Sequence, residues 1–314
     1  MRVLVTGAWG HIGTYTVREL LAQGHAVRAL DLPTRANRKK AAAFGGGIEV
    51  AWGDVRNGTD VAQAVAGQGA VVHLAFVLPP GSEQQPDLAY AVNVEGSRQL
   101  IAAMKAQTPA PRLIFGSSFS VHGDTLHEDT LLTPASPLRP LNHYNEHKVA
   151  VEGMVRDSDL AWCILRFGTA LATDPDRGFD PVIFALPPAA KQEFVHPADV
   201  ALAIANCLGS SEAWGQVWMI GGGPHCQLRY GEMINRMLEA TGIGSLPAKA
   251  FSPTARQGGG WMDTAESQRV LRYQRHSFED FLAEFAARAG ARKYLFRLLS
   301  PLIRWYIVRQ SPYC

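Results

Sequence analysis

The fold of this chain is decided by the stretch RVLVTGAWGHIGTYTVRELLAQG, residues 2–24. Residues 2–7 form an apolar run of strand length, and residues 12–24 have the spacing of an amphipathic helix. The turn between them carries three glycines in a G-x-x-G-x-x-G pattern, Gly7, Gly10 and Gly13. Glycines let the backbone turn tightly and approach a ligand closely, and the start of the helix offers N–H groups and a positive dipole end. The stretch therefore predicts a strand–turn–helix unit that binds the pyrophosphate of a dinucleotide.

Six further apolar runs of strand length follow this unit, and helical patterns such as residues 89–105 separate them. They cover residues 26–31, 48–54, 70–76, 112–118, 162–168 and 217–222. Most of the runs are continuous rather than alternating, as in parallel strands that are covered on both faces. A series of strands and helices with right-handed crossovers predicts an α/β fold with a Rossmann-type doubly wound parallel sheet.

The pattern loosens after the sixth run, which predicts a second, smaller lobe. We expect residues 1–165 to form the dinucleotide-binding Rossmann core, completed by a strand and a helix within 195–222. The remaining segments predict a mainly helical substrate-binding lobe with a basic amphipathic tail, and they cover residues 166–194 and 223–314. Loops rich in Pro, Gly and Asp are expected at 173–181 and 252–260.

An acidic residue follows the glycine turn at the distance that a dinucleotide fold requires. Asp31 ends the second strand 18 residues after Gly13 (31 − 13), and an acid about 20 residues past the turn binds the ribose hydroxyls. Its charge would repel a 2′-phosphate, so we expect NAD rather than NADP. A basic run lies just downstream, which we interpret as a solvated loop and helix face: Arg35, Arg38, Lys39 and Lys40.

The composition narrows the classes of partner and compartment. The net charge is +2, from 30 basic and 28 acidic residues, which gives no reason to expect a nucleic acid as partner. The four cysteines are scattered, without the spacing of a disulfide framework or a zinc site. The N-terminal residues run directly into a strand, and no apolar run reaches the length of about 18 that spans a membrane. We therefore expect a cytoplasmic protein, with any membrane association confined to its tail.

Several separate motifs together resemble the extended short-chain dehydrogenase/reductase family, also called the NAD-dependent epimerase/dehydratase family. The resemblance covers residues 1–225 and rests on T-G-x-x-G-x-x-G (6–13), Y-x-x-x-K (144–148) and the segments 73–75, 93–96, 117–123 and 194–201. Phe76 departs from the family pattern, because a second Ala usually stands there. The resemblance implies NAD as cofactor, bound by Gly7, Trp9, Gly10, His11, Ile12, Gly13, Asp31, Asp54, Val55, Leu74, Ala75, Asn93, Tyr144 and Lys148.

The reacting groups of this hypothesis are Tyr144, Lys148 and Ser118. Tyr144 and Lys148 are four residues apart and share one face of a predicted helix. A free phenol has a pKa near 10, and a lysine ammonium with a nearby nicotinamide cation would lower it. Tyr144 would then exchange a proton with a secondary alcohol or ketone while Ser118 holds the substrate oxygen. Substrate contacts are expected from Ser118, Phe119 and Ser120.

Other polar clusters near these residues predict no separate chemistry. Three histidines are alternative bases, but no carboxylate spacing supports a triad, so we interpret them as loop or surface residues: His122, His143 and His147. A second cluster lies in a loop without metal-ligand spacing, and we interpret it as a solvated turn and expect no metal: Asp124, His127, Glu128 and Asp129.

The resemblance leaves the substrate open between two classes. Family members that dehydrate sugars carry an acid pair after the catalytic Ser or Thr, where this chain has Phe119 and Ser120. Nucleotide-sugar enzymes commonly carry an Arg near the diphosphate, where this chain has Gln192. We therefore expect a secondary alcohol or ketone on an apolar or alicyclic substrate. A nucleotide-sugar 4-epimerase is the alternative, and a dinucleotide-binding sensor is the non-enzyme alternative.

The tail adds a basic amphipathic segment. From residue 285 onward there are six basic residues and no acidic ones. As a helix, residues 294–308 would place Lys293, Arg297, Ser300 and Arg304 on one stripe opposite the apolar side chains, with a kink at Pro301. This face predicts docking on the substrate lobe or on the second subunit of a homodimer, or contact with a membrane surface. We favour docking on the lobe.

Overall fold

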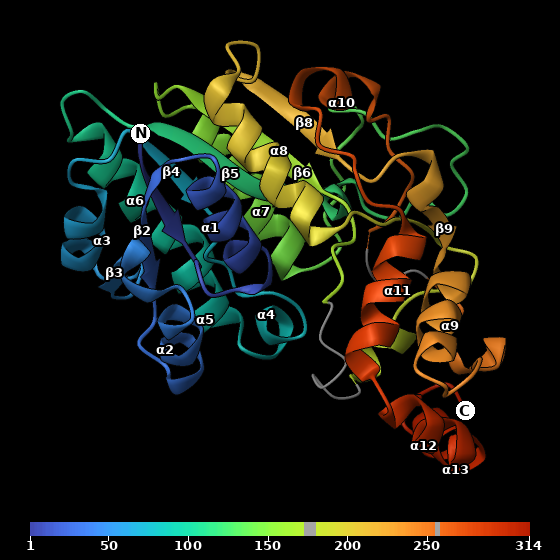
Figure 1. Cartoon of the computed structure of the whole chain (residues 1–314). Coiled ribbons are helices and arrows are strands. Elements are labelled where there is room, and N and C mark those ends of the chain that lie inside the picture. Colours follow the sequence, from blue (N-terminus) through green and yellow to red (C-terminus); the bar gives the residue numbers. More distant parts are fainter. Residues whose placement is uncertain (173–179, 255–257) are drawn as a thin grey trace.

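The computed structural model describes residues 1–172, 180–254 and 258–314, and at its centre lies one parallel sheet (Figure 1). Seven strands follow the order β3-β2-β1-β4-β5-β6-β8. Their bounds are β1 Arg2–Thr6, β2 Ala26–Asp31, β3 Glu49–Trp52, β4 Ala70–His73, β5 Arg112–Ser118, β6 Trp162–Phe167 and β8 Gln216–Ile220. Each strand overlaps one of the seven apolar runs, and the doubly wound parallel sheet is confirmed.

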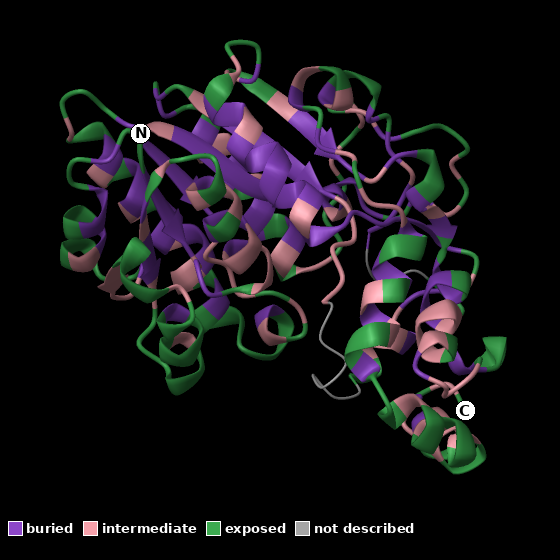
Figure 2. Cartoon of the chain, in the orientation of Figure 1, coloured by how far each residue is buried: buried purple, intermediate pink, exposed green. Residues whose placement is uncertain are grey.

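Helices cover both faces of the sheet. α1 (His11–Ala22) and α8 (Pro197–Gly209) pack on one face, and α3 (Gly58–Val65), α6 (Gly96–Lys105) and α7 (His143–Arg156) on the other. Within β1, Val3 and Val5 belong to the first apolar cluster and Leu4 to the second. Alternate side chains of one strand thus enter two separate cores, so the strand is apolar on both faces and its residues after Arg2 are buried. The strands of the central sheet are mostly buried (Figure 2).

The helix expected over 89–105 is interrupted. It consists of α5 (Pro86–Tyr90), a π-helical turn η2 (Ala91–Glu95) and α6. The π turn carries Asn93, and such turns inside helices are frequent at functional sites. The core also contains α2 (Arg35–Ala42) and α4 (Gly81–Gln84).

The second lobe is mainly helical. It contains α9 (Tyr230–Ala240), α11 (Phe278–Ala289), α12 (Arg292–Leu298) and α13 (Ser300–Val308). Two strands that we did not predict, β7 (Lys191–Glu193) and β9 (Gln227–Arg229), pair antiparallel within it. Each has only three residues and no apolar run, so hydrophobic periodicity could not reveal it. Of the predicted loops, residues 173–179 and 255–257 lie outside the described residues.

One part of the segment that we assigned to the lobe packs on the Rossmann core instead. α10 (Ala265–Leu271) lies against α8 and β8, and Leu271 and Tyr273 are buried in the apolar cluster of α1 and α8. The Tyr273 hydroxyl donates a hydrogen bond to the carbonyl oxygen of Gly221 just after β8 (2.8 Å). The chain therefore returns to the core before it forms α11.

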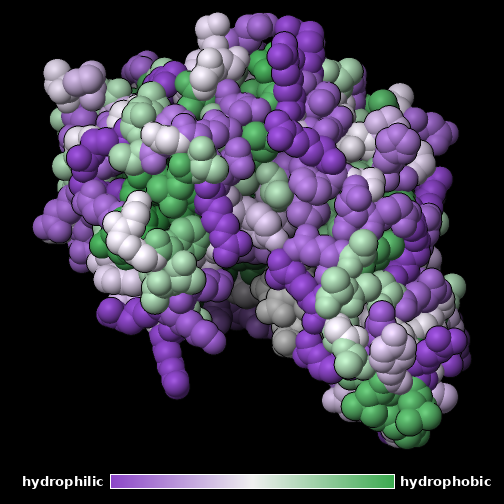
Figure 3. Space-filling model, viewed as in Figure 1, coloured by the Kyte–Doolittle hydropathy of each residue, from purple (hydrophilic) through white to green (hydrophobic). Residues whose placement is uncertain are grey.

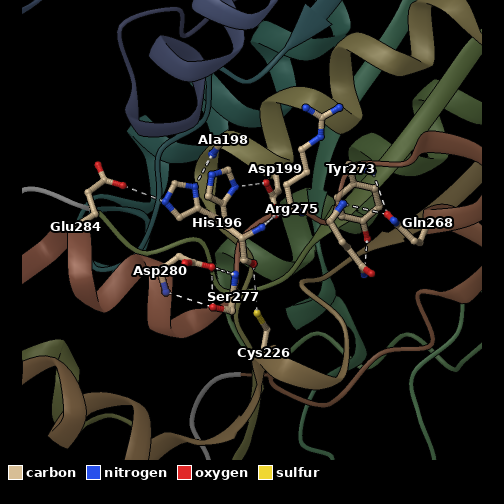
Figure 4. Close-up of polar contacts among 12 residues, drawn as sticks. His196, Ala198, Asp199, Cys226, Gln268, Tyr273, Arg275, Ser277, Asp280 and Glu284 are labelled. Carbon is tan, nitrogen blue, oxygen red and sulfur yellow. Dashed lines mark hydrogen bonds and ion pairs between the residues drawn. The ribbon is translucent and has the colours of Figure 1, made fainter.

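The core and the lobe are joined by polar contacts at the start of α8 (Figure 4). Asp199 accepts hydrogen bonds from the backbone N–H groups of Arg275 and His276 (2.9 and 3.0 Å) and from the His276 ring (2.6 Å). The His196 ring stacks on His276 with centroids 4.4 Å apart, and its Nε2 donates to Glu284 of α11 (3.2 Å). The segment 194–201 thus holds α11 against the core.

Candidate active site

The turn between β1 and α1 has a backbone that only glycine fits. Gly7 has φ +65°, and a Cβ there would come within 2.8 Å of the Ala75 backbone. A Cβ on Gly13 would overlap the carbonyl oxygen of Gly7. Gly10 caps α1 with its backbone and has no side chain that could take the place of an anion at the helix start. The turn fits the pyrophosphate of a dinucleotide.

Asp31 lies beside this turn and is held in place by its neighbours. Its carboxylate accepts hydrogen bonds from the backbone N–H groups of Trp9 and Leu32 (2.8 Å each) and from Asn37 Nδ2 (3.1 Å). Sequence reasoning missed Asn37, although its position three residues after the helix cap Thr34 was a usable signal. The carboxylate is therefore oriented at the end of β2, where the adenosine ribose of a dinucleotide lies in this fold.

The basic run after Asp31 lies on α2 and is exposed. Within it, Lys40 donates to the Trp9 carbonyl oxygen (2.6 Å), and the Arg38 guanidinium lies over the Trp52 ring (5.1 Å to its centroid). These contacts engage both cations with groups other than Asp31.

The segment 73–75 is positioned by a buried hydrogen-bond network. The Thr6 hydroxyl accepts from the N–H groups of Leu74 and Ala75 (3.2 Å each) and donates to His73 Nδ1 (2.7 Å). His73 Nε2 donates to Ser97 (2.8 Å), whose hydroxyl donates to the Asn93 carbonyl oxygen. Burial lowers the pKa of His73 to about 3, so the ring is neutral, as this pattern requires. Thr6, the first residue of the glycine motif, to which the sequence assigned no separate role, thus fixes Leu74 and Ala75 beside the glycine turn.

Asn93 completes this network from the π turn η2. Its amide binds the Val77 backbone through both atoms, with Oδ1 accepting at 2.7 Å and Nδ2 donating at 3.1 Å. Its Nδ2 also lies 3.2 Å from His147 Nδ1. Asn93 thereby ties the chain after β4 to α7.

Asp54 and Val55 follow β3 at the same edge of the sheet. Arg56 binds the Asp54 carboxylate (2.5 Å) and lowers the pKa of that carboxyl below its usual value. Val55 is buried against Gly96 of α6, where a Cβ would come within 3.0 Å of the valine side chain. The pair therefore lies next to Asp31 in the sheet, since the Gly53 N–H donates to the Asp31 carbonyl oxygen (3.1 Å).

Tyr144 and Lys148 lie on the first two turns of α7. Asn142 caps this helix by accepting from the Asn145 N–H (3.0 Å), and Glu83 of α4 accepts from the N–H groups of His143 and Tyr144 (3.2 Å each). The Tyr144 hydroxyl bonds to Ser118 at the end of β5, and burial raises the pKa of the phenol to about 12. The structure thus brings Ser118 and Tyr144 together, as the motifs predicted.

Lys148 is buried and faces aromatic rings. Its Nζ donates to the Gly116 carbonyl oxygen of β5 (2.5 Å) and lies 3.5 Å from the centroid of the Phe76 ring and 5.7 Å from that of Tyr144. Burial lowers the pKa of Lys148 to about 7, partly offset by the negative charge of Glu152. Phe76, which departs from the family pattern, therefore packs between Lys148 and Tyr144, whose ring it meets edge-on (5.8 Å between centroids).

A chain of hydrogen bonds leads from the phenol into the protein. Ser120 donates to Asn145 Oδ1 (2.7 Å), and Ser118 therefore donates to Ser120 (2.8 Å) and is left to accept from Tyr144. Asn145 is fully buried, and its Nδ2 has no hydrogen-bond partner among the described residues. Sequence reasoning missed Asn145. Phe119, which we expected to touch substrate, is buried in a small apolar cluster with Leu132, Met219 and Met262.

A buried ion pair lies behind Lys148 and holds α7 against β6. Glu152, four residues after Lys148, accepts from Ser117 (2.7 Å) and forms an ion pair with Arg166 of β6 (2.7 Å). Both partners are buried, and because they pair with each other, neither carries an uncompensated charge inside the protein.

Two of the three alternative bases are buried, so our interpretation of them as loop or surface histidines was wrong. His122 Nδ1 donates to the Pro137 carbonyl oxygen (3.0 Å), and its Nε2 accepts from Arg166 (3.2 Å). His147 packs under Tyr90, and burial lowers the pKa of both buried histidines. His143 is exposed beside Glu146 (3.3 Å). The burial of His122 follows from its contact with Arg166, a distant residue that no local pattern reveals.

The acidic loop cluster is engaged by basic partners. Arg139 pairs with Glu128 (2.5 Å), and Lys191 binds Asp129 (3.3 Å) and the Glu128 carbonyl oxygen. Within residues 1–172, 180–254 and 258–314, no group of three His, Cys, Asp or Glu side chains is placed to hold a metal ion.

The apolar segment before β7 fills the core of the lobe. Phe184, Leu186 and Ala190 are buried with residues of α9 and α11. The apolar character of this segment therefore serves the packing of the lobe. Gln192, which stands where nucleotide-sugar enzymes carry an Arg, is buried and accepts from Thr169 (2.7 Å), and its Nε2 finds no partner in the part of the chain that the structure describes.

Comparisons with known proteins place these features in context. Residues 3–185 match the model of the NAD dependent epimerase/dehydratase family. UDP-glucose 4-epimerase 3 of Oryza sativa subsp. japonica is 31% identical over 197 residues, which are 57% of this chain and 52% of the relative. A 3-beta-hydroxysteroid dehydrogenase of Mycolicibacterium neoaurum is 33% identical over 165 residues, 49% of this chain and 42% of the relative. The alignments thus span about half the length of these curated relatives.

Solved structures share the fold across most of the chain. The UDP-glucuronic acid 4-epimerase of Bacillus cereus in complex with UDP-glucuronic acid and NAD has a TM-score of 0.77 at 22% identity, covering 92% of this chain and 99% of that one. The UDP-glucose 4-epimerase of Thermus thermophilus in complex with NAD has a TM-score of 0.75 at 24% identity, covering 93% and 100%. At this level of identity the likeness concerns the fold.

Proposed function

Because this chain belongs to the NAD-dependent epimerase/dehydratase family, we propose that it is an enzyme that interconverts a secondary alcohol and a ketone by hydride transfer with NAD. The observation that carries the proposal is the meeting of Ser118, Tyr144 and Lys148 at the carboxyl edge of the sheet. Ligands of open α/β sheets bind at that edge. A sensor that only binds the dinucleotide would not need these three groups together.

The residues of the chain divide the chemistry between them. NAD, when bound, would supply the acceptor for the hydride of the carbinol carbon. When substrate binds, the Ser118 hydroxyl would turn from Ser120 to donate a hydrogen bond to the substrate oxygen, which fixes its position. Tyr144, as phenolate, takes the hydroxyl proton, and the C–O bond becomes a carbonyl; in the reverse direction the phenol returns the proton. Lys148, as an ammonium, would hold the ribose of the bound cofactor and favour the phenolate of Tyr144.

The cofactor contacts carry over from the geometry of the core. We propose that the glycine turn holds the pyrophosphate, that Asp31 accepts from the adenosine ribose, and that Asp54 and Val55 face the adenine. Leu74, Ala75 and Asn93 would line the path towards the nicotinamide. Thr6 and Asn37 are positioning residues, since they act through Ala75 and Asp31.

The proposed substrate is a secondary alcohol or ketone of apolar or alicyclic character, without a diphosphate. Gln192 in place of a cation near the expected diphosphate position supports it, because a neutral amide pairs poorly with a dianion. A second candidate, 4-epimerisation of a nucleotide sugar, is favoured by the identity to curated UDP-glucose 4-epimerases. Both reactions begin with the same hydride transfer.

The test is an assay of purified protein with NAD. A panel of alicyclic and aliphatic secondary alcohols is followed by the rise of NADH absorbance, and UDP-galactose is followed by its conversion to UDP-glucose. Net NADH formation, lost in Tyr144→Phe, supports the dehydrogenase. Epimerisation without net NADH selects the second candidate. Binding of NAD with neither reaction in any member of the panel would favour the sensor.

Besides the substrate, we expect a partner that binds the C-terminal segment of the lobe. We propose that residues 294–308 contact a partner surface, and this contact does not depend on the active site.

A further inference from the structure

The helices α12 and α13 form the end of the lobe farthest from the Rossmann sheet (Figure 1). One side of them packs on the lobe, where Ile307 is buried with Ile303 and Val308 against its core. The Ser311 hydroxyl donates to the Ala250 carbonyl oxygen (2.6 Å) and fixes the chain after α13. The docking that we favoured from the sequence therefore accounts for one face of these helices.

The other face of the two helices is apolar and exposed. Leu298, Leu302 and Trp305 are 77%, 67% and 58% exposed. Of the fourteen exposed large hydrophobic residues in the described part of the chain, seven lie in this short segment: Tyr294, Leu295, Leu298, Leu299, Leu302, Trp305 and Tyr306. Figure 3 shows a continuous hydrophobic tip at this end of the lobe. A gathered patch of this kind marks an interaction surface, whereas single exposed leucines do not.

Basic side chains lie beside this tip. The segment after residue 285 carries six basic residues and no acidic one. The Arg309 guanidinium lies over the Trp305 ring (4.7 Å), and the Lys293 ammonium lies beside the Tyr294 ring (5.3 Å). Cations next to Trp and Tyr at the rim of an apolar surface suit the boundary between lipid headgroups and acyl chains.

An apolar tip with basic side chains beside it fits some binding partners better than others. A second copy related by a two-fold axis would set the basic tip against itself, and the like charges would repel. Insertion across a bilayer does not fit either, because no helix in the described part of the chain is long and apolar enough to cross one. An anionic lipid surface matches both the apolar side chains and the basic rim.

We propose that α12 and α13 dock this protein on an anionic membrane surface, with Leu298, Leu302 and Trp305 entering the acyl boundary and Arg297 and Arg309 contacting anionic headgroups. The helices would lie in the plane of the membrane surface. The proposal rests on residues outside the active site and is independent of the reaction.

Flotation with vesicles tests the proposal. The full-length protein should float with phosphatidylcholine vesicles that contain phosphatidylserine and much less with phosphatidylcholine alone. The double variant Leu298→Ser/Leu302→Ser should bind at least about tenfold more weakly, because two leucines no longer enter the lipid. Arg297→Gln/Arg309→Gln should lose about tenfold on anionic vesicles only. The matched control Leu88→Ser/Leu131→Ser removes exposed leucines elsewhere and should float like the wild type.

Two further measurements keep the outcomes distinct. The thermal unfolding temperature of the tip variants should equal that of the wild type, since these side chains contact solvent. Equal flotation with both vesicle types, or none, would overturn the proposal. A lipid-free dimer in sedimentation that Leu298→Ser/Leu302→Ser splits, without flotation of the wild type, would assign the tip to a second copy instead.

Discussion

Replacing Lys148 by methionine should stabilise the protein without its cofactor while it damages function. The Lys148 ammonium is buried, and its pKa falls from 10.5 to about 7. This difference corresponds to at most about 5 kcal/mol of cost for the charged form in the fold. The hydrogen bond to Gly116 and the contact with the Phe76 ring offset the cost of burying the charge only in part. Below pH 7 the charged Lys148 therefore destabilises the fold by up to this amount.

The sign of the pH dependence follows from the lowered pKa. Between about pH 7 and 10.5 the unfolded chain holds a proton on this lysine that the folded chain has lost, so stability from this group rises with pH through that window. Lys148→Met should therefore exceed the wild type in free energy of unfolding at pH 6, and the difference should vanish by pH 10. Urea denaturation at the two pH values measures it, and the difference between the proteins cancels the other titrating groups.

The same variant separates a functional from a structural lysine. Lys148→Met should also weaken NAD binding and turnover, because the ammonium serves the cofactor and Tyr144. If Lys148→Met were less stable than the wild type at pH 6, or if the difference did not change with pH, the reasoning about its burial would be refuted.

Two other predictions concern the cofactor end of the site. The wild type should bind NAD at least about tenfold more tightly than NADP, and Asp31→Ser should reduce that ratio by weakening NAD binding. Isothermal titration calorimetry measures both affinities, and tighter NADP binding by the wild type would contradict the role of Asp31 in cofactor choice. Gly13→Ala should cost about 1–3 kcal/mol of stability and abolish NAD binding, because its Cβ meets the Gly7 carbonyl. Its matched control Gly153→Ala has open space in α7 and should be neutral or stabilising, and equal thermal unfolding of both variants would contradict the steric role of Gly13.

Local patterns predicted the parts of this molecule that local forces determine. The seven strands follow from apolar runs, because helices cover both faces of the sheet and bury most of the strand residues. The glycine turn follows from steric limits at Gly7 and Gly13 that hold in any protein with this backbone. Ser118 and Tyr144 could be paired because the motif order fixes which strand end meets which helix.

The remainder depends on contacts between distant residues, which no local pattern contains. His122 is buried because Arg166, 44 positions away, binds it. The apolar side chains around Phe184 pack on α9 and α11, so their hydrophobicity carried no information about the substrate. The prediction that residues 294–308 dock on the lobe was incomplete for the same reason. One apolar face of α13 meets the lobe through Ile307, whereas Leu302 and Trp305 on the other side meet solvent.

The most direct test of the proposed chemistry is the ionisation of Tyr144 itself. The difference in absorbance at the tyrosinate band between the wild type and Tyr144→Phe isolates this one phenol during a pH titration. Without cofactor the phenol should titrate near its raised pKa of about 12. Any cation brought within about 5 Å of a phenolate stabilises it by about 3 kcal/mol at an effective dielectric of about 20, or about two pKa units, and bound NAD would supply such a cation in its nicotinamide ring. Saturating NAD should therefore lower the pKa of Tyr144 by at least about two units, and an unchanged titration would contradict its assignment as the acid–base group.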